Sequence, residues 1–161
     1  RSITRDQLAM RMKDDDWAAV IDTNLSAVFR LARAVMRGMM KARFGRIVNI
    51  SSVVGYSGNA GQANYCAAKA GMDHFTRCLA LDEALKPHGA KVTSLAPGVI
   101  DTDMQVQLRG AAPENFPDQD GFKQLKATGQ LTTPAAAAER ILAYLARPDF
   151  GSNPVSDVRD A

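Results

Sequence analysis

The sequence predicts an α/β fold in which helices cover a layer of two or three parallel strands. Two apolar runs, Arg46 to Ser51 and KVTSLA from Lys91, have the composition of buried parallel strands. Between them, the Ala-rich segment Asn64 to Leu85 predicts a helix, and a turn at Pro87 to Gly89 separates it from the second run. Strands that alternate with helices in this way indicate an α/β layer architecture.

Two further helices are predicted ahead of the first strand. Thr4 to Arg11 has the pattern of a short helix. Asp14 to Asp16 provide an N-cap and an acidic first turn for a long helix that runs to about Ala42, with Gly45 after its end. The long helix therefore leads into the first strand.

The region after the second strand is expected to cover a binding site. The segment Gly110 to Gly129 contains Pro113 and Pro117 and predicts a mobile lid with short helices. Pro134 is suited to the first turn of a last helix, which is expected to end near Arg147.

Composition excludes several classes of protein. No stretch approaches the roughly 20 apolar residues of a membrane helix, so no membrane partner is expected. Cys66 and Cys78 lie twelve residues apart on one predicted helix, about 18 Å along its axis, and are expected to be core thiols of a cytoplasmic protein. His74 and His88 have no metal-ligand spacing, so no metal is expected. The net charge of +3 comes without a nucleic-acid-binding motif, so no nucleic acid is expected either.

The most informative pair of residues is Tyr65 and Lys69. Four residues apart on a helix, their side chains lie on the same face. A lysine ammonium beside a phenol favours the phenolate, so Lys69 is expected to lower the pKa of Tyr65 from about 10 towards neutral pH. A tyrosine of this kind is suited to act as a general acid.

Ser52 and Asn24 complete a set of four candidates with this pair. Taken alone, Ser52 is a turn former after a strand, and Asn24 is a poor helix-interior residue whose side chain is expected to bond to backbone. The combination of all four residues, at these spacings, is what indicates a hydride-transfer site.

This set, together with APGVIDT at Ala96 to Thr102, resembles the short-chain dehydrogenase/reductase superfamily. The region from Ile3 to about Met72 is similar to bacterial 3-oxoacyl-[acyl-carrier-protein] reductases. The C-terminal tail from Gly129 is more similar to sepiapterin and benzil reductases, as is VIDTDMQVQLRG before it.

The resemblance implies a role for each matched residue. Tyr65 would protonate the carbonyl oxygen, and Ser52 would donate a hydrogen bond to it. Lys69 would lower the pKa of Tyr65 and bind the nicotinamide ribose, while Asn24 would hold a water in a proton relay behind Lys69. The implied cofactor-binding residues are Tyr65, Lys69, Pro97, Gly98, Ile100 and Thr102.

The implied fold is the C-terminal part of a doubly wound, Rossmann-type parallel sheet. Residues 1–161 are expected to form a single partial domain that lacks the N-terminal phosphate-binding half. The implied function is NADPH-dependent carbonyl reduction, with NADH as the alternative cofactor, acting on 3-oxoacyl-[acyl-carrier-protein] in fatty acid biosynthesis. The alternatives are reduction of another ketone or diketone, or a truncated, non-catalytic oligomerisation remnant.

Two kinds of partner follow from the same reasoning. The carbonyl substrate is either a small molecule or bound to an acyl carrier protein, whose acidic helix could meet Lys41 and Arg43. The two long helices match those that form the subunit interface of homodimers and homotetramers in this superfamily. Apolar residues lie on more than one face of the first of them, at Ala19, Val20, Leu25, Val28, Phe29, Ala32, Val35 and Met36.

Overall fold

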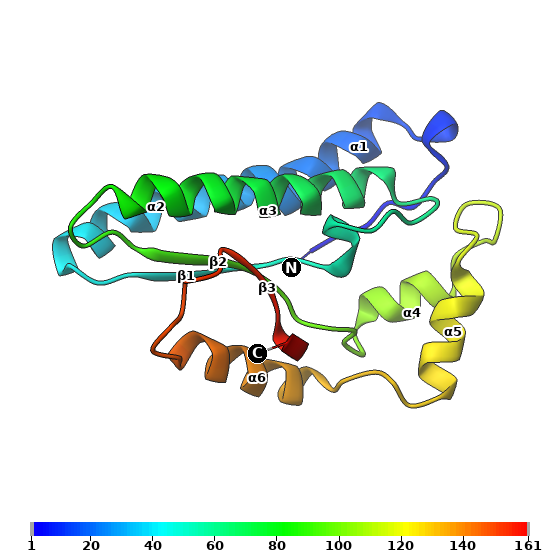
Figure 1. Ribbon diagram of the computed structural model, residues 1–161. Helices are drawn as coiled ribbons and strands as arrows, with labels where there is room; N and C mark the ends of the chain where they lie inside the picture. Colours follow the sequence, from blue (N-terminus) through cyan, green and yellow to red (C-terminus); the bar gives the residue numbers. More distant parts are fainter. Residues whose placement is uncertain (1, 161) are drawn as a thin grey trace.

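The computed structural model describes residues 2–160 and has a three-stranded parallel sheet between two helical layers (Figure 1). The strands are β1 (Arg46–Ile50), β2 (Lys91–Ala96) and β3 (Val155–Asp157), in the order β1-β2-β3. Helices α1, α2 and α3 cover one face, and α6 covers the other. The predicted fold class is confirmed. The predicted single domain, 1–161, includes one residue at each end that lies outside the described range.

The register of the sheet aligns the carboxyl ends of its strands. Ile50 pairs with Leu95, and Ala96 pairs with Asp157. Segments that follow the strands therefore emerge at one edge of the sheet, which is where open α/β sheets place their sites. The sequence located β1 and β2 but not β3, because a strand of three residues is too short for a periodic pattern.

The predicted long helix is confirmed, with an irregularity in its middle. It consists of α1 (Asp14–Ile21), a π-helical turn η2 (Asp22–Ser26) and α2 (Ala27–Ala42). Arg43 ends it in the left-handed region, with φ 52°. The π-turn contains the buried Asn24, and such turns are frequent at functional sites.

The predicted helix Thr4 to Arg11 is wrong. Only a short 3-10 turn, η1 (Ala9–Arg11), forms there. The preceding residues are extended because their backbone groups bond to distant segments: the Gln7 N–H donates to the Gly61 carbonyl at 2.8 Å, and the Ile3 N–H donates to Asn24 Oδ1 at 3.1 Å. These long-range bonds replace the local bonds of a helix.

Helix α3 (Ala63–Ala84) packs against the sheet and confirms the predicted central helix. Its Leu79 joins Ala32, Ile47 and Val92 in one apolar cluster. On the opposite face, Leu95 packs with Tyr144 and its neighbours from the C-terminal region. Cys66 is part-buried but Cys78 is exposed, so the expectation of two core thiols is wrong for Cys78.

The remaining helices follow β2. They are α4 (Asp103–Arg109), α5 (Gln119–Ala127) and α6 (Pro134–Ala146), the last of which confirms the predicted C-terminal helix. Helix α5, in the predicted lid segment, lies against α4, which precedes that segment. Phe116 of the lid is fully buried and packs against Phe122, with 5.4 Å between the tilted rings' centroids. Within residues 2–160, no helix is both long and apolar enough to cross a membrane.

Candidate active site

Ser52, Tyr65 and Lys69 meet at the carboxyl end of β1. Ser52 directly precedes the short turn η3 (Val53–Gly55), while Tyr65 and Lys69 are one turn apart on α3. The Lys69 Nζ lies 5.5 Å from the centroid of the Tyr65 ring, and Ser52 is hydrogen-bonded to the Tyr65 hydroxyl. Tyr65 is 8% exposed and Lys69 only 1%. Three of the four residues singled out by the sequence thus form one cluster, in which Tyr65 and Lys69 are buried and Ser52 is half-buried.

The Lys69 ammonium is held by two oxygen atoms. Its Nζ donates to the Ile50 carbonyl at 2.7 Å and to Ser2 Oγ at 3.3 Å. An ammonium has three N–H donors, so these bonds leave the capacity for one more, to a ligand oxygen. The contact with Ile50 attaches α3 to the last residue of β1, directly before Ser51.

The expected lowering of the Tyr65 pKa is wrong. Burial raises the pKa of Tyr65 to about 12, and the hydrogen bond with Ser52 only partly opposes this effect. Burial also lowers the pKa of Lys69 to about 8, against the attraction of Asp73. Desolvation is therefore the main cause that sets the acidity of the phenol.

Asn24 is connected to this cluster through the N-terminal segment. Its Nδ2 donates to the Ile3 carbonyl at 2.8 Å, and its Oδ1 accepts from the Ile3 N–H. Ser2, the neighbour of Ile3, accepts from Lys69. The side chain thus bonds to backbone, as its residue type suggested, and its role in a water relay stays a prediction.

The four residues predicted to contact the nicotinamide lie on the segment that leaves β2. Pro97 is buried, and Gly98 has φ +78°, a conformation that favours glycine. Ile100 pairs with Thr132 in an isolated bridge, and Thr102 is the N-cap of α4. The segment places Met104 against the apolar cluster that includes Tyr65, so it reaches the vicinity of the phenol.

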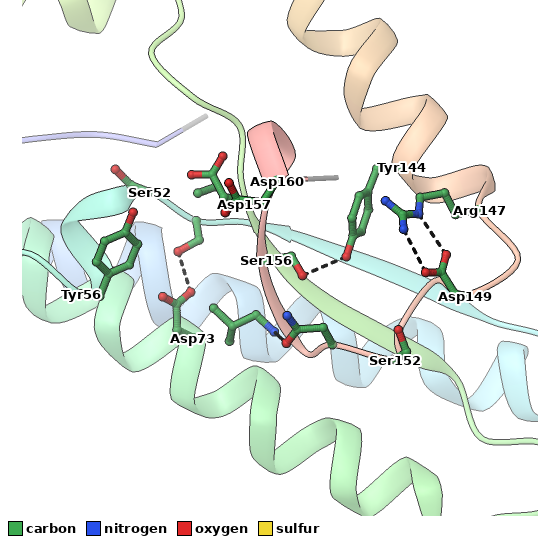
Figure 2. Close-up of a pocket in the computed structure, with 14 residues that line it drawn as sticks. Ser52, Tyr56, Asp73, Tyr144, Arg147, Asp149, Ser152, Ser156, Asp157 and Asp160 are labelled. Carbon is green, nitrogen blue, oxygen red and sulfur yellow. Dashed lines mark hydrogen bonds and ion pairs between the residues drawn. The ribbon is translucent and has the colours of Figure 1, made fainter.

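A buried carboxylate next to the site was not identified from the sequence. Asp73 lies one turn after Lys69 on α3, and its Oδ1 accepts from Ser51 Oγ at 2.5 Å and from Ser94 Oγ at 2.6 Å. Figure 2 shows it directed towards a polar cavity of about 370 Å³, which Ser52 also lines. The available signal was the spacing of four residues that already linked Tyr65 to Lys69.

The family of the chain follows from comparison with known proteins. The family model for short chain dehydrogenases matches residues 2–112, which include all the candidate site residues described above. The chain therefore belongs to the short-chain dehydrogenase family, as the sequence predicted.

Its relatives include several bacterial 3-oxoacyl-[acyl-carrier-protein] reductases named FabG. The chain is 56% identical to that of Pseudomonas aeruginosa over 112 residues, which is 70% of this chain and 44% of the relative. It is 46% identical to that of Vibrio harveyi over 151 residues, 91% of this chain and 57% of the relative. It is 60% identical to that of Escherichia coli K12 over 102 residues, 63% and 41% of the two chains. The chain spans about half the length of these relatives.

The solved structures give the same fold. The crystal structure of the KRED1-Pglu enzyme superimposes with a TM-score of 0.85 at 24% identity, over 97% of this chain and 65% of that one. The V. harveyi match covers 91% of the chain, yet the resemblance of the tail to sepiapterin and benzil reductases stays a prediction.

Proposed function

We propose that this chain provides the proton-donating site of an NAD(P)-dependent carbonyl reductase. The observation that supports this best is the cluster of Ser52 with the buried Tyr65 and Lys69 at the carboxyl end of a parallel sheet. A phenol, a hydroxyl and an ammonium together can bind a carbonyl oxygen, donate a proton to it and stabilise the charge that remains.

Each of these residues has a distinct task. A pKa of about 12 keeps the Tyr65 phenol protonated at neutral pH, so it has a proton to donate. Ser52, which hydrogen-bonds the phenol, would donate to the same carbonyl oxygen as negative charge develops on it. Lys69, whose pKa of about 8 leaves it mostly charged at pH 7, would stabilise the phenolate.

The residues present fit the nicotinamide end of a dinucleotide. When bound, the cofactor supplies the hydride. Lys69 has the capacity for one more hydrogen bond, as a ribose hydroxyl would require. Gly98 has no side chain at the turn where Pro97, Ile100 and Thr102 would line the ring. We propose NADPH as the cofactor, with NADH as the alternative.

For the substrate we propose a 3-oxoacyl group on an acyl carrier protein. The names of the relatives, at 46% to 62% identity, support this assignment. Lys41 and Arg43 are exposed at the end of α2, where an acidic carrier helix could approach them. A compact ketone or diketone is the alternative, suggested by the tail sequence.

Complementation of the chain tests the proposal. The N-terminal part of the P. aeruginosa relative, up to the matched region, is co-expressed with this chain, and NADPH oxidation is measured with an acetoacetyl thioester and with a diketone. Tyr65→Phe should lower kcat at least about a hundredfold, because general acid catalysis is typically worth 10² to 10⁴. His74→Gln, on the exposed side of the same helix, is the matched control.

Three results would change the proposal. A Tyr65→Phe complex within a few-fold of the parent would show that Tyr65 is not the acid. Turnover of the diketone alone would reverse the order of the two substrates. A stable complex that turns over neither would favour the non-catalytic alternative.

A further inference from the structure

Asp73 is a buried carboxylate that binds two strands of the sheet to helix α3. It is 4% exposed, and its Oδ1 accepts hydrogen bonds from Ser51, directly after β1, and from Ser94 on β2. Ser51 in turn donates its backbone N–H to the Leu95 carbonyl at 2.9 Å. The carboxylate therefore lies at the point where the ends of both strands meet the helix.

The same carboxylate lies directly against the turn that follows Ser52. A Cβ added to Gly55, the last residue of η3, would be 2.5 Å from Asp73 Oδ2, which is closer than such atoms approach. Glycine is thus what allows the turn and the carboxylate to be in contact. The position of Ser52 depends on this turn, since Ser52 Oγ accepts from the Val54 N–H at 3.5 Å.

Asp73 and Lys69 both bind the end of β1, at adjacent residues. Lys69 donates to the carbonyl of Ile50, and Asp73 accepts from the hydroxyl of Ser51. Their spacing of four residues places them on one face of α3, after Tyr65 on the same face. A buried carboxylate with no cation near it would be costly, and so would a buried ammonium with no anion.

The other charged groups around Asp73 belong to the opposite wall of the cavity. Asp157 and Asp160 line it from the C-terminal segment (Figure 2), and Asp157 is bound by Arg159. Arg147 also lines the cavity but is held by Asp149. Lys69 is thus the cation on the same side as Asp73, and the attraction of Asp73 opposes the lowering of the Lys69 pKa by burial.

We propose that Asp73 is a positioning residue for the proposed reductase site, whose carboxylate aligns Ser51 and the Ser52 turn with α3 and balances the charge of the Lys69 ammonium. This inference rests on the proposed function for its catalytic meaning. Three residues at successive turns of α3 then act together. Tyr65 is the acid, Lys69 is the cation beside it, and Asp73 is the anion that balances Lys69.

The pairing of Asp73 with Lys69 is measurable on the chain as it is, without cofactor or substrate. The side-chain ¹³Cε resonance of Lys69, assigned by its loss in Lys69→Arg, is followed by NMR from pH 6 to pH 11. In the parent chain, the midpoint of the Lys69 titration is expected near pH 8. Asp73→Asn keeps the shape of the side chain but removes its charge, so the midpoint should fall by about one pH unit, a tenfold change in proton affinity.

Two variants separate charge from structure. Ser94→Ala removes one hydrogen bond to Asp73 and should leave the midpoint within a few tenths of a pH unit. Asp82→Asn removes an exposed carboxylate from the same helix and should behave in the same way. A midpoint in Asp73→Asn equal to that of Asp82→Asn would overturn the proposal. If Asp73→Asn does not fold, the titration of Lys69 in the parent chain tests the proposal. A Lys69 titration midpoint below about pH 7 would show that no anion stabilises the ammonium and would overturn the proposal.

The catalytic part of the inference has its own readout in the complemented reductase. The limb of the kcat–pH profile that reports Lys69 should move to lower pH in Asp73→Asn by the same amount as the NMR midpoint. A variant that only loosened the fold would lower kcat at every pH and leave the limb in place, which would reject the role in catalysis. If the NMR midpoint moves as expected but no variant or parent turns over substrate, the proposed function fails and the Asp73–Lys69 pairing stands.

Discussion

Helices α2 and α3 cover the same face of the sheet but are built in opposite ways. Helix α3 buries polar side chains, namely those of Asn64, Tyr65, Lys69, Asp73, Thr76 and Glu83. Helix α2 buries only Ala32 and exposes large apolar side chains, namely Phe29, Leu31, Val35 and Met40. The interior helix thus buries polar groups, whereas α2 leaves large apolar side chains exposed.

The difference shows what each helix contributes. The buried polar groups of α3 all have hydrogen-bond partners: Asn64 donates to the Arg5 carbonyl, Thr76 accepts from Asn49, and Glu83 accepts from the Ala90 N–H. Such bonds recover the cost of burying polar groups and define one arrangement of the site. Of the exposed apolar side chains of α2, Phe29 packs edge-on against Phe75. All of them leave apolar surface exposed, which is suited to contact another subunit.

The comparison predicts that equal truncations will have very different effects on the two helices. Leu79 on α3 is 6% exposed, whereas Leu31 on α2 is 68% exposed. Leu79→Ala should lower the free energy of unfolding by about 2 to 5 kcal/mol, because it leaves a cavity in the core. Leu31→Ala should change it by less than about 0.5 kcal/mol. Urea titrations monitored by circular dichroism measure both, and similar losses would show that α2 is buried as deeply as α3.

A second prediction concerns the pH dependence of stability that Lys69 imposes. Its pKa is lowered in the folded chain from 10.5 to about 8, so the unfolded chain binds more protons between these values. The free energy of unfolding should therefore rise with pH over this range, and a Lys69→Met variant should lack that rise.

The expected size follows from about 1.4 kcal/mol per pKa unit, which gives roughly 2 to 3 kcal/mol between pH 7 and pH 10 for the parent relative to Lys69→Met. Comparison with the variant removes the contribution of other groups, including Tyr65, whose raised pKa lowers stability only as the pH rises above about 10. A difference between parent and variant that stays constant from pH 7 to pH 10 would show that Lys69 is not desolvated.

The fold was predictable wherever the structure of a segment depends on the residue pattern within that segment. The strand β1 ends one residue before the predicted Ser51, and α3 spans the predicted helix to within one residue at each end. The extended segment that contains Ile3 was not predictable, because its hydrogen bonds go to Asn24, 21 residues away. A three-residue strand such as β3 lies below the length at which periodicity is visible.

The candidate site likewise has features that the sequence predicted and features that it did not. That Tyr65 and Lys69 lie together follows from helical geometry alone. The direction of the shift in the Tyr65 pKa could not be predicted in this way. It depends on how deeply the phenol is buried, which is a property of the packed structure. The role of Asp73 was hidden for a similar reason: its partners Ser51 and Ser94 come from two strands that only the folded sheet brings together.

The last prediction has the smallest effect on folding and tests the outward face of α2 as a subunit interface. Val35 is 45% exposed and lies one helical turn from Leu31. Val35→Lys would place a charge within the exposed apolar surface, and a contact between two copies would have to bury that charge without a partner. The free energy of unfolding of the single chain should change by less than about 0.5 kcal/mol.

Association, in contrast, should be strongly weakened. Sedimentation velocity of the parent is expected to show dimers or larger assemblies whose weight-average mass falls towards that of the monomer in Val35→Lys. Leu142→Lys, at an exposed apolar position on α6, is the control. Because α6 covers the opposite face of the sheet, dissociation by Leu142→Lys with an intact assembly in Val35→Lys would place the interface on α6 instead. The apolar surface of α2 would then need another explanation.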